Sequence, residues 1–276
     1  MLAKRWATAL TLLAGFLACL FWLSEPAWTL LLLLPLVLGA REWGALSDFK
    51  PLGSAVFALG SALLGAAMYV WGAPYHALVY LAAMAFWVLL APLWLVFGWR
   101  LDNVLIRIVS GWLILLPLVL AMLDLRAYSP VVLLLLMAVV WIGDSAAFFS
   151  GKRFGKRKLA PGISPGKTWE GVAGAWLAVT LYAAIILLVA ESQGRAHAFA
   201  DGWLPLALLA WLLLYLSILG DLFESWIKRL AGAKDSGTLL PGHGGLLDRI
   251  DALTSSLPVA ALIVLHGNEL YRVVVQ

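Results

Sequence analysis

Long apolar runs dominate the chain, and short polar stretches separate them. The runs are continuous and do not alternate with polar residues, so they indicate membrane-spanning helices and not the strands of a membrane barrel. A helix of about 20 apolar residues crosses the hydrocarbon core of a bilayer. We predict nine spans, at 6–23, 27–40, 53–72, 76–98, 105–123, 130–150, 169–190, 203–220 and 252–267. The second is short for a crossing, so it either extends toward Trp43 or tilts little.

The composition supports a membrane protein. Hydrophobic residues make up 63% of the 276 positions and charged residues 12%, whereas soluble domains have roughly 45–50% and about 25%. A water-soluble fold could not bury this excess of apolar side chains. We therefore predict an all-α, polytopic membrane helix bundle. We divide it into an N-terminal set of about five spans, 1–128, and a C-terminal region, 129–276.

The basic residues predict the orientation. Three of the 19 lysines and arginines, Arg126, Arg195 and Arg272, fall on one side of a nine-span chain, and the other 16 fall on the opposite side. Basic residues are retained in the cytoplasm. The N-terminus should therefore be cytoplasmic and the C-terminus external.

Two cytoplasmic connections, 151–168 and 221–251, stand out for their length and polarity. In the second, Asp221, Ser225 and Lys228 have the spacing of one helix face if the eighth span continues into it. Positive charge at a cytoplasmic helix end is an ordinary topology signal. Carboxylates among the basic residues are not needed for topology, and they indicate a site.

A glycine-rich run, 241–245, follows in the same connection and cannot be helical. Its glycines permit close backbone approach and expose N–H groups that can bind phosphate. Asp248 and Asp251 come one turn apart at the start of the ninth span. Together with Asp221 they could hold magnesium, which prefers hard oxygens and substrate phosphates. Alternatively, Asp248 or Asp251 caps the last helix, and His243 is a turn residue.

The connection 151–168 shows a weaker indication of a phosphate-binding site. Ser164, Lys167 and Thr168 lead into the seventh span, and a helix N-terminus with such neighbours can bind an anion. Thr168 is equally plausible as a helix N-cap. The preceding basic residues are interpreted mainly as topology signals: Lys152, Arg153 and Arg157.

Asp144 lies inside the sixth predicted span. A carboxylate there costs at least about 2.5 kcal/mol unless it faces protein or water. It either forms a hydrogen bond to a neighbouring helix or faces a polar cavity near the cytoplasmic end. We favour the cavity.

Residues 225–251 contain a long motif: Ser, two residues, Lys-Arg, four residues, Lys-Asp, then Pro-x-His-Gly-Gly, two residues and Asp-Arg-x-Asp. Its positions here are Ser225, Lys228, Arg229, Lys234, Asp235, Pro241, His243, Gly244, Gly245, Asp248, Arg249 and Asp251. This motif resembles the signature of phosphatidate cytidylyltransferases, also called CDP-diacylglycerol synthases. Gly220-Asp221 and the stretch 163–171 also look like that family, so the resemblance runs through about 144–256.

The resemblance implies an Mg²⁺-dependent nucleotidyltransferase of phospholipid biosynthesis that transfers CMP from CTP to phosphatidate. It implies Asp221, Lys228 and Asp248 as catalytic residues, and Asp221 and Asp248 as metal ligands. The implied phosphate binders are Lys167, Lys228 and Arg229. The position of Asp144 inside an apolar span adds the hypothesis that it is a metal ligand or a neighbour of the metal. The implied substrate-binding residues are Ser164, Lys167, Thr168, Ser225, Arg229, Lys234, Asp235, His243, Gly244, Gly245, Arg249 and Asp251. The site would face the cytoplasmic leaflet of a bacterial inner membrane. We expect no nucleic-acid partner, and a homodimer is compatible with the sequence.

Other functions remain open from the sequence. The same chemistry could act on a polyprenol or another lipid acceptor. A transporter would need ionisable residues in several spans, and Asp144 is the only good candidate. A purely structural scaffold gives no reason for the polar connection 221–251.

Overall fold

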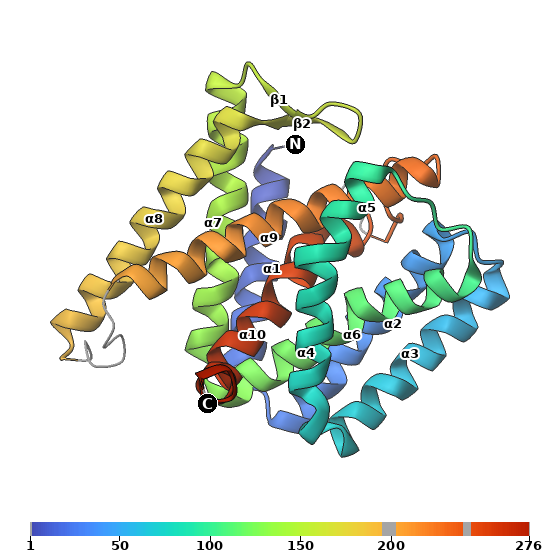
Figure 1. Ribbon diagram of the computed structural model, residues 1–276, viewed down its shortest axis with the longest axis horizontal. Helices are drawn as coiled ribbons and strands as arrows, with labels where there is room; N and C mark the ends of the chain where they lie inside the picture. The colour runs from blue at the N-terminus through green and yellow to red at the C-terminus, as the bar shows by residue number, and fades with distance from the viewer. Residues whose placement is uncertain (1, 195–202, 240–243, 276) are drawn as a thin grey trace.

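The computed structural model describes residues 2–194, 203–239 and 244–275, with the outermost residues of the first and last helices in backbone only. Within these ranges the chain is a bundle of long helices with one small two-stranded hairpin at its edge (Figure 1). The helices are α1 (Leu2–Trp22), α2 (Glu25–Leu46), α3 (Pro51–Trp71), α4 (His76–Ala85), α5 (Ala91–Phe97), α6 (Val104–Tyr128), α7 (Pro130–Phe154), α8 (Trp169–Ser192), α9 (Trp203–Leu230) and α10 (Leu247–Val275). Two short helical turns, η1 (Ala73–Tyr75) and η2 (Phe86–Leu90), adjoin α4, and the strands are β1 (Lys158–Ala160) and β2 (Ser164–Thr168). The prediction of an all-α membrane bundle is confirmed.

Eight helices of the described chain are long and apolar enough to cross a bilayer. They correspond to the second through ninth predicted spans, with α4, η2 and α5 together forming the span Ala73–Phe97. The described part of α1 adds a shorter apolar helix, Leu13–Trp22, within the first predicted span. α2 runs well past the predicted 27–40, to Leu46. It therefore has the length for a crossing that the prediction lacked.

The connection 151–168 is more ordered than the sequence indicates. α7 continues through its first four residues, and β1 and β2 then pair antiparallel. Pro161 follows β1 and favours a turn because its φ is preset. The turn is closed by the Ile163 N–H, which donates to the Ala160 carbonyl at 3.1 Å. The hairpin is thus a compact polar element at the mouth of the bundle.

Glycines let α7 and α8 approach each other closely. A Cβ atom on Gly171 would lie 2.9 Å from the Ala147 carbonyl oxygen, and one on Gly174 would clash with the Ser150 hydroxyl. Small residues at a helix contact allow such close packing in membranes. Because α8 follows directly from β2, this contact holds the hairpin beside the end of α7 (Figure 1).

α9 and α10 meet in the same way at Gly220. A Cβ atom there would lie 2.5 Å from both the Asp251 carbonyl oxygen and the Ser255 hydroxyl. Ser255 also donates to the Leu216 carbonyl at 2.7 Å. The contact places Asp221, the next residue of α9, beside the turn of α10 that carries Asp251.

α10 packs against α4 and α6 as well as against α9. One continuous apolar core therefore includes helices from both sides of residue 128. The proposed division of the chain into 1–128 and 129–276 stays a prediction. In Figure 1 the start of α1 and the hairpin lie toward one edge of the bundle, and the end of α10 lies toward the opposite edge.

Candidate active site

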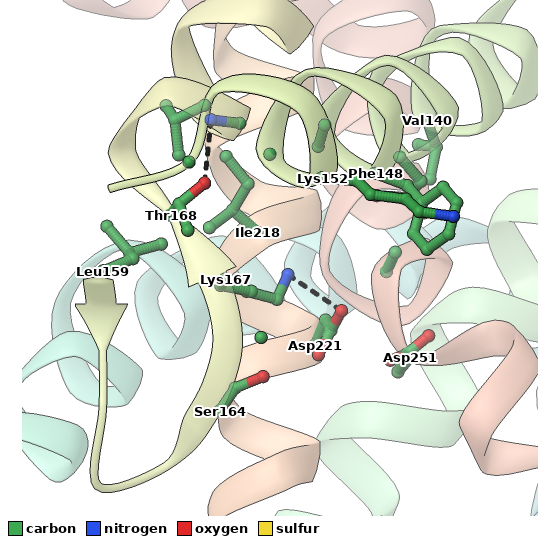
Figure 2. Close-up of a pocket in the computed structure, with 18 of the residues that line it drawn as sticks. Val140, Phe148, Lys152, Leu159, Ser164, Lys167, Thr168, Ile218, Asp221 and Asp251 are labelled. Atoms are coloured by element: carbon green, nitrogen blue, oxygen red, sulfur yellow. Dashed lines mark hydrogen bonds and ion pairs between the residues drawn. The ribbon is translucent and has the colours of Figure 1, made fainter. Parts of the chain in front are cut away.

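A cavity of about 810 Å³ opens where α7, α8, α9, α10 and the hairpin meet. Eight of the predicted site residues line it: Asp144, Ser164, Lys167, Thr168, Asp221, Asp248, Arg249 and Asp251. They come from both polar connections and from the sixth predicted span. The structure thus brings together groups that lie more than 100 positions apart in the sequence. Figure 2 shows several of them around the cavity.

Lys167 and Asp221 form an ion pair across the cavity wall. The Lys167 ammonium lies 2.8 Å from Oδ2 of Asp221, and the Ser225 hydroxyl donates to Oδ1 at 3.3 Å. β2 carries the lysine and α9 carries the two other residues (Figure 2). The hairpin therefore supplies the charge that neutralises the α9 carboxylate.

Asp144 lies on the wall formed by α7, in the same cavity as Asp221 and Asp251. Asp144 therefore lines a cavity, as the sequence predicts. Its role toward a metal stays a prediction. α7 contributes Val140, Asp144, Phe148 and Lys152 to the wall, so one helix face follows the cavity over about 12 residues, or roughly 18 Å at 1.5 Å per residue.

Asp248 holds the polar loop in place. Its Oδ1 accepts from the Lys228 ammonium at 2.5 Å. Its Oδ2 accepts from the Ser236 N–H at 2.8 Å, the Ser236 hydroxyl at 3.0 Å and the Gly245 N–H at 2.8 Å. Both oxygens are therefore occupied by protein donors. Asp248 lines the cavity, but as a metal ligand it would have to exchange some of these contacts.

Lys228 lies behind the cavity wall. Its ammonium forms ion pairs at 2.5 Å with both Glu224 and Asp248, and the residue is 9% exposed. It is not among the residues that line the cavity. Its observed contacts are those of a buried counter-ion, while its predicted role as a phosphate partner and catalytic residue stays a prediction.

Glu42 of α2 is part of this network, although the sequence did not single it out. Its carboxylate accepts from the Ser236 hydroxyl at 2.9 Å and from the N–H groups of Leu246 and Leu247 at 2.9 and 2.8 Å. It satisfies free N–H groups at the start of α10, as an N-cap does, but from another helix. The sequence contains little signal for this role, because Glu42 lies just beyond the predicted second span, where a charged residue is ordinary.

The glycine-rich run is described only from Gly244. This residue has a φ of 82°, and a Cβ atom on it would lie 2.6 Å from Oδ2 of Asp248. Both facts favour glycine there. His243 lies outside the described residues, so its predicted role is not addressed. The Gly245 N–H donates to Asp248 at 2.8 Å, and phosphate binding by the glycine-rich run stays a prediction.

Most of the remaining predicted residues lie outside the cavity lining, and Thr168 has a structural role beside it. Thr168 caps α8, since its hydroxyl accepts from the Gly171 N–H at 3.1 Å, and it also lines the cavity. Arg229 reaches the hairpin turn and the loop, donating to the carbonyls of Ile163 at 3.4 Å and Ala233 at 3.2 Å. The cavity lining does not include Ser225, Arg229, Lys234, Asp235, Gly244 or Gly245. Substrate binding by any of these residues stays a prediction.

The carboxylates of the cavity have the chemistry that magnesium requires, because Mg²⁺ prefers a few carboxylate oxygens together with substrate phosphates. As the side chains are placed, no group of three or more His, Cys, Asp or Glu residues within the described ranges converges closely enough to hold a metal ion. The donor set fits the ion, and its coordination stays a prediction.

Comparison with known proteins adds an independent finding. A model of the "Cytidylyltransferase family" matches residues 3–266. The chain is 41% identical to a phosphatidate cytidylyltransferase of Pseudomonas aeruginosa over 96% of its own length and 97% of that protein. It is 33% identical to the protein of that name from Haemophilus influenzae, over 94% of this chain and 96% of the relative. The one from Bacillus subtilis is 46% identical over 123 residues, which cover 44% of this chain and 42% of the relative. A family match over nearly the whole length and a full-length relative above 30% identity agree with the motif at 225–251, and the chain belongs to the cytidylyltransferase family.

Proposed function

We propose that this integral membrane protein is a phosphatidate cytidylyltransferase, which transfers CMP from CTP to phosphatidate and releases pyrophosphate. The observation that carries the proposal is the cavity between α7, α8, α9 and α10. It contains carboxylates and lysines for a triphosphate, and it is walled by helices long enough to cross a membrane. The names of the full-length relatives support the same activity.

The reaction suits the residues of the cavity. A phosphate oxygen of phosphatidate attacks the α-phosphorus of CTP, and the bond between that phosphorus and the oxygen bridging to the β-phosphate breaks. The nucleophile is already an anion, so no strong base is needed. Such phosphoryl transfers depend on positioning and charge stabilisation. Here Lys167, held by Asp221, would orient phosphate oxygens, and the hairpin would shield the reacting groups from one side.

The proposed reaction also requires a bound Mg²⁺ ion. Asp221 would be a ligand, Asp248 a second, and Asp144 a ligand or a neighbour of the ion. The bound ion would supply positive charge for the triphosphate and for the departing pyrophosphate. The protein's own contribution is to hold these carboxylates on rigid helices, where Gly220 places Asp221 and the Lys228 network places Asp248.

The basic-residue asymmetry supports a cytoplasmic site in an inner membrane. CTP is available on that side, and the lipid would reach the cavity from the cytoplasmic leaflet. A homodimer stays a prediction.

The test is a purified-protein assay of pyrophosphate release from CTP. We expect release that depends on both phosphatidate and Mg²⁺, with labelled CDP-diacylglycerol as the lipid product. Polyprenyl phosphate and diacylglycerol serve as alternative acceptors. Turnover with one of these and none with phosphatidate would refute the proposed substrate, and Asp221→Asn provides the inactive control.

A further inference from the structure

Two of the cations that the sequence assigns to phosphate binding are already paired with carboxylates. Lys167 is bound to Asp221 at 2.8 Å, and Lys228 contacts Glu224 and Asp248 at 2.5 Å each. Each therefore offers less uncompensated charge to a phosphate that enters the cavity. A substrate carrying several negative charges needs further positive groups on the wall.

Two other lysines of the cavity wall, Lys152 and Lys158, supply such groups. Both line the cavity. Neither forms an ion pair with a carboxylate among the described residues, in contrast to Lys167. Lys158 begins β1, on the hairpin, and Lys152 lies in the last turn of α7.

Lys152 has a defined position. Its ammonium lies 5.9 Å from the centre of the Phe148 ring, one helical turn away, a distance at which the ring face attracts a cation. Figure 2 shows the side chain lying along Phe148, apart from the Lys167–Asp221 pair. Phe148 lines the cavity and is also 62% exposed on a helix that spans the membrane. Lys152 is therefore held at the border between the polar cavity and the surface that faces lipid.

This border matches the chemistry of one substrate. A lipid phosphate has its anionic head at the membrane surface and its glycerol and acyl chains on the apolar side. On α7 the wall residues run from Lys152 through Phe148 to Asp144, about 12 Å deeper at 1.5 Å per residue, and the apolar Val140 lies one turn beyond Asp144. The Asp144, Asp221 and Asp251 carboxylates lie on the same cavity wall, farther along the helices from Lys152.

We propose that Lys152, aided by Lys158, binds the phosphate group of the acceptor lipid at the mouth of the cavity. The inference rests on the proposed function and adds a specific binding role to a lysine that the sequence presents as a topology signal. Phe148 keeps the ammonium at the cavity mouth and provides an apolar surface for the lipid beneath it.

Arg153 provides a matched control. It is the next residue of α7, it carries the same charge on the same side of the membrane, and it does not line the cavity. We expect Lys152→Gln to lower kcat/KM for phosphatidate about 10- to 100-fold, the effect of losing one charge-assisted hydrogen bond. The KM for CTP at saturating phosphatidate should stay near the wild-type value. Arg153→Gln should change neither, and Lys152→Arg should restore most of the loss.

Binding without turnover separates this inference from the proposed function. Nanodiscs of phosphatidylcholine with and without phosphatidate, lacking CTP, allow lipid binding to be measured for the wild type, Lys152→Gln and Arg153→Gln. Weaker phosphatidate binding by Lys152→Gln alone would support the site. Equal behaviour of the two variants, or a rise confined to the KM for CTP, would overturn it even if the wild type makes CDP-diacylglycerol. A wild type that binds phosphatidate but makes no product would instead contradict the proposed function.

Discussion

Replacing Lys228 by glutamine tests whether this residue acts on substrate or holds the site together. The ammonium lies between Glu224 and Asp248 at 2.5 Å from each. Both Glu224 oxygens are buried and have no hydrogen-bond partner within the described chain apart from the ion pair to Lys228. The variant would leave one carboxylate without compensation and a second with part of its contacts.

Removing one partner of a buried ion pair costs about 3–5 kcal/mol. We expect Lys228→Gln to lose that much stability in an SDS titration of the detergent-solubilised protein. Since 1.4 kcal/mol is a factor of ten, this is a change of more than about 100-fold in the unfolding equilibrium. The double variant Glu224→Gln/Lys228→Gln removes the orphaned charge and should recover at least half of the lost stability.

Turnover per folded molecule distinguishes the two roles. If Lys228 mainly positions Asp248, the double variant should regain activity along with stability. A direct phosphate partner would cost about 2–4 kcal/mol of transition-state stabilisation, and the second substitution would not restore it. A Lys228→Gln protein of wild-type stability with a rate loss of that size would refute the structural interpretation.

Four further outcomes are expected. Asp221→Asn should abolish most turnover while the protein still folds, because a proposed metal ligand and the partner of Lys167 loses its charge; near-normal rates at limiting Mg²⁺ would exclude it as a ligand. Asp144→Asn should raise the Mg²⁺ concentration needed for half-maximal rate, whereas an unchanged Mg²⁺ dependence and rate in a stable variant would remove Asp144 from the site. Glu42→Ala should cost roughly 1–3 kcal/mol for the buried donors left unpaired and speed amide hydrogen exchange in the first turn of α10; unaltered exchange there would contradict the capping role. A cysteine at position 157, in a chain without its native cysteine, should escape labelling from outside intact cells, and efficient external labelling would reverse the orientation.

The helices were predictable because each apolar run has the length of a membrane and few polar interruptions. The meeting of Asp144 with Asp221 and Asp251 was also within reach, since a buried carboxylate needs a polar environment and the two connections lie on one side. The sequence of α7 also contains a spacing pattern that relates Lys152 to the cavity. Asp144, Phe148 and Lys152 are spaced four apart, which places them on one helix face.

Other features depend on contacts that a one-dimensional pattern does not contain. The resemblance of the motif places Lys228 among the phosphate-binding residues. Only the packing of α9 against α10 shows that Lys228 lies between two carboxylates. Glu42 is separated from Leu247 by 205 positions. A hydrogen bond between such distant residues depends on how α2 lies against α10, which periodicity does not predict.

The bond between Glu42 and the start of α10 has a consequence for biosynthesis. Chains are made from the N-terminus, so α2 is in the membrane long before its partner leaves the ribosome. Until α10 is inserted, Lys228 and Ser236 lack Asp248, and Glu42 lacks the N–H groups at the start of α10. A nascent chain would therefore carry most of its helices without a working site. Catalytic competence should arise abruptly, with the last helix, so that incompletely synthesised chains remain inert toward nucleotide and lipid.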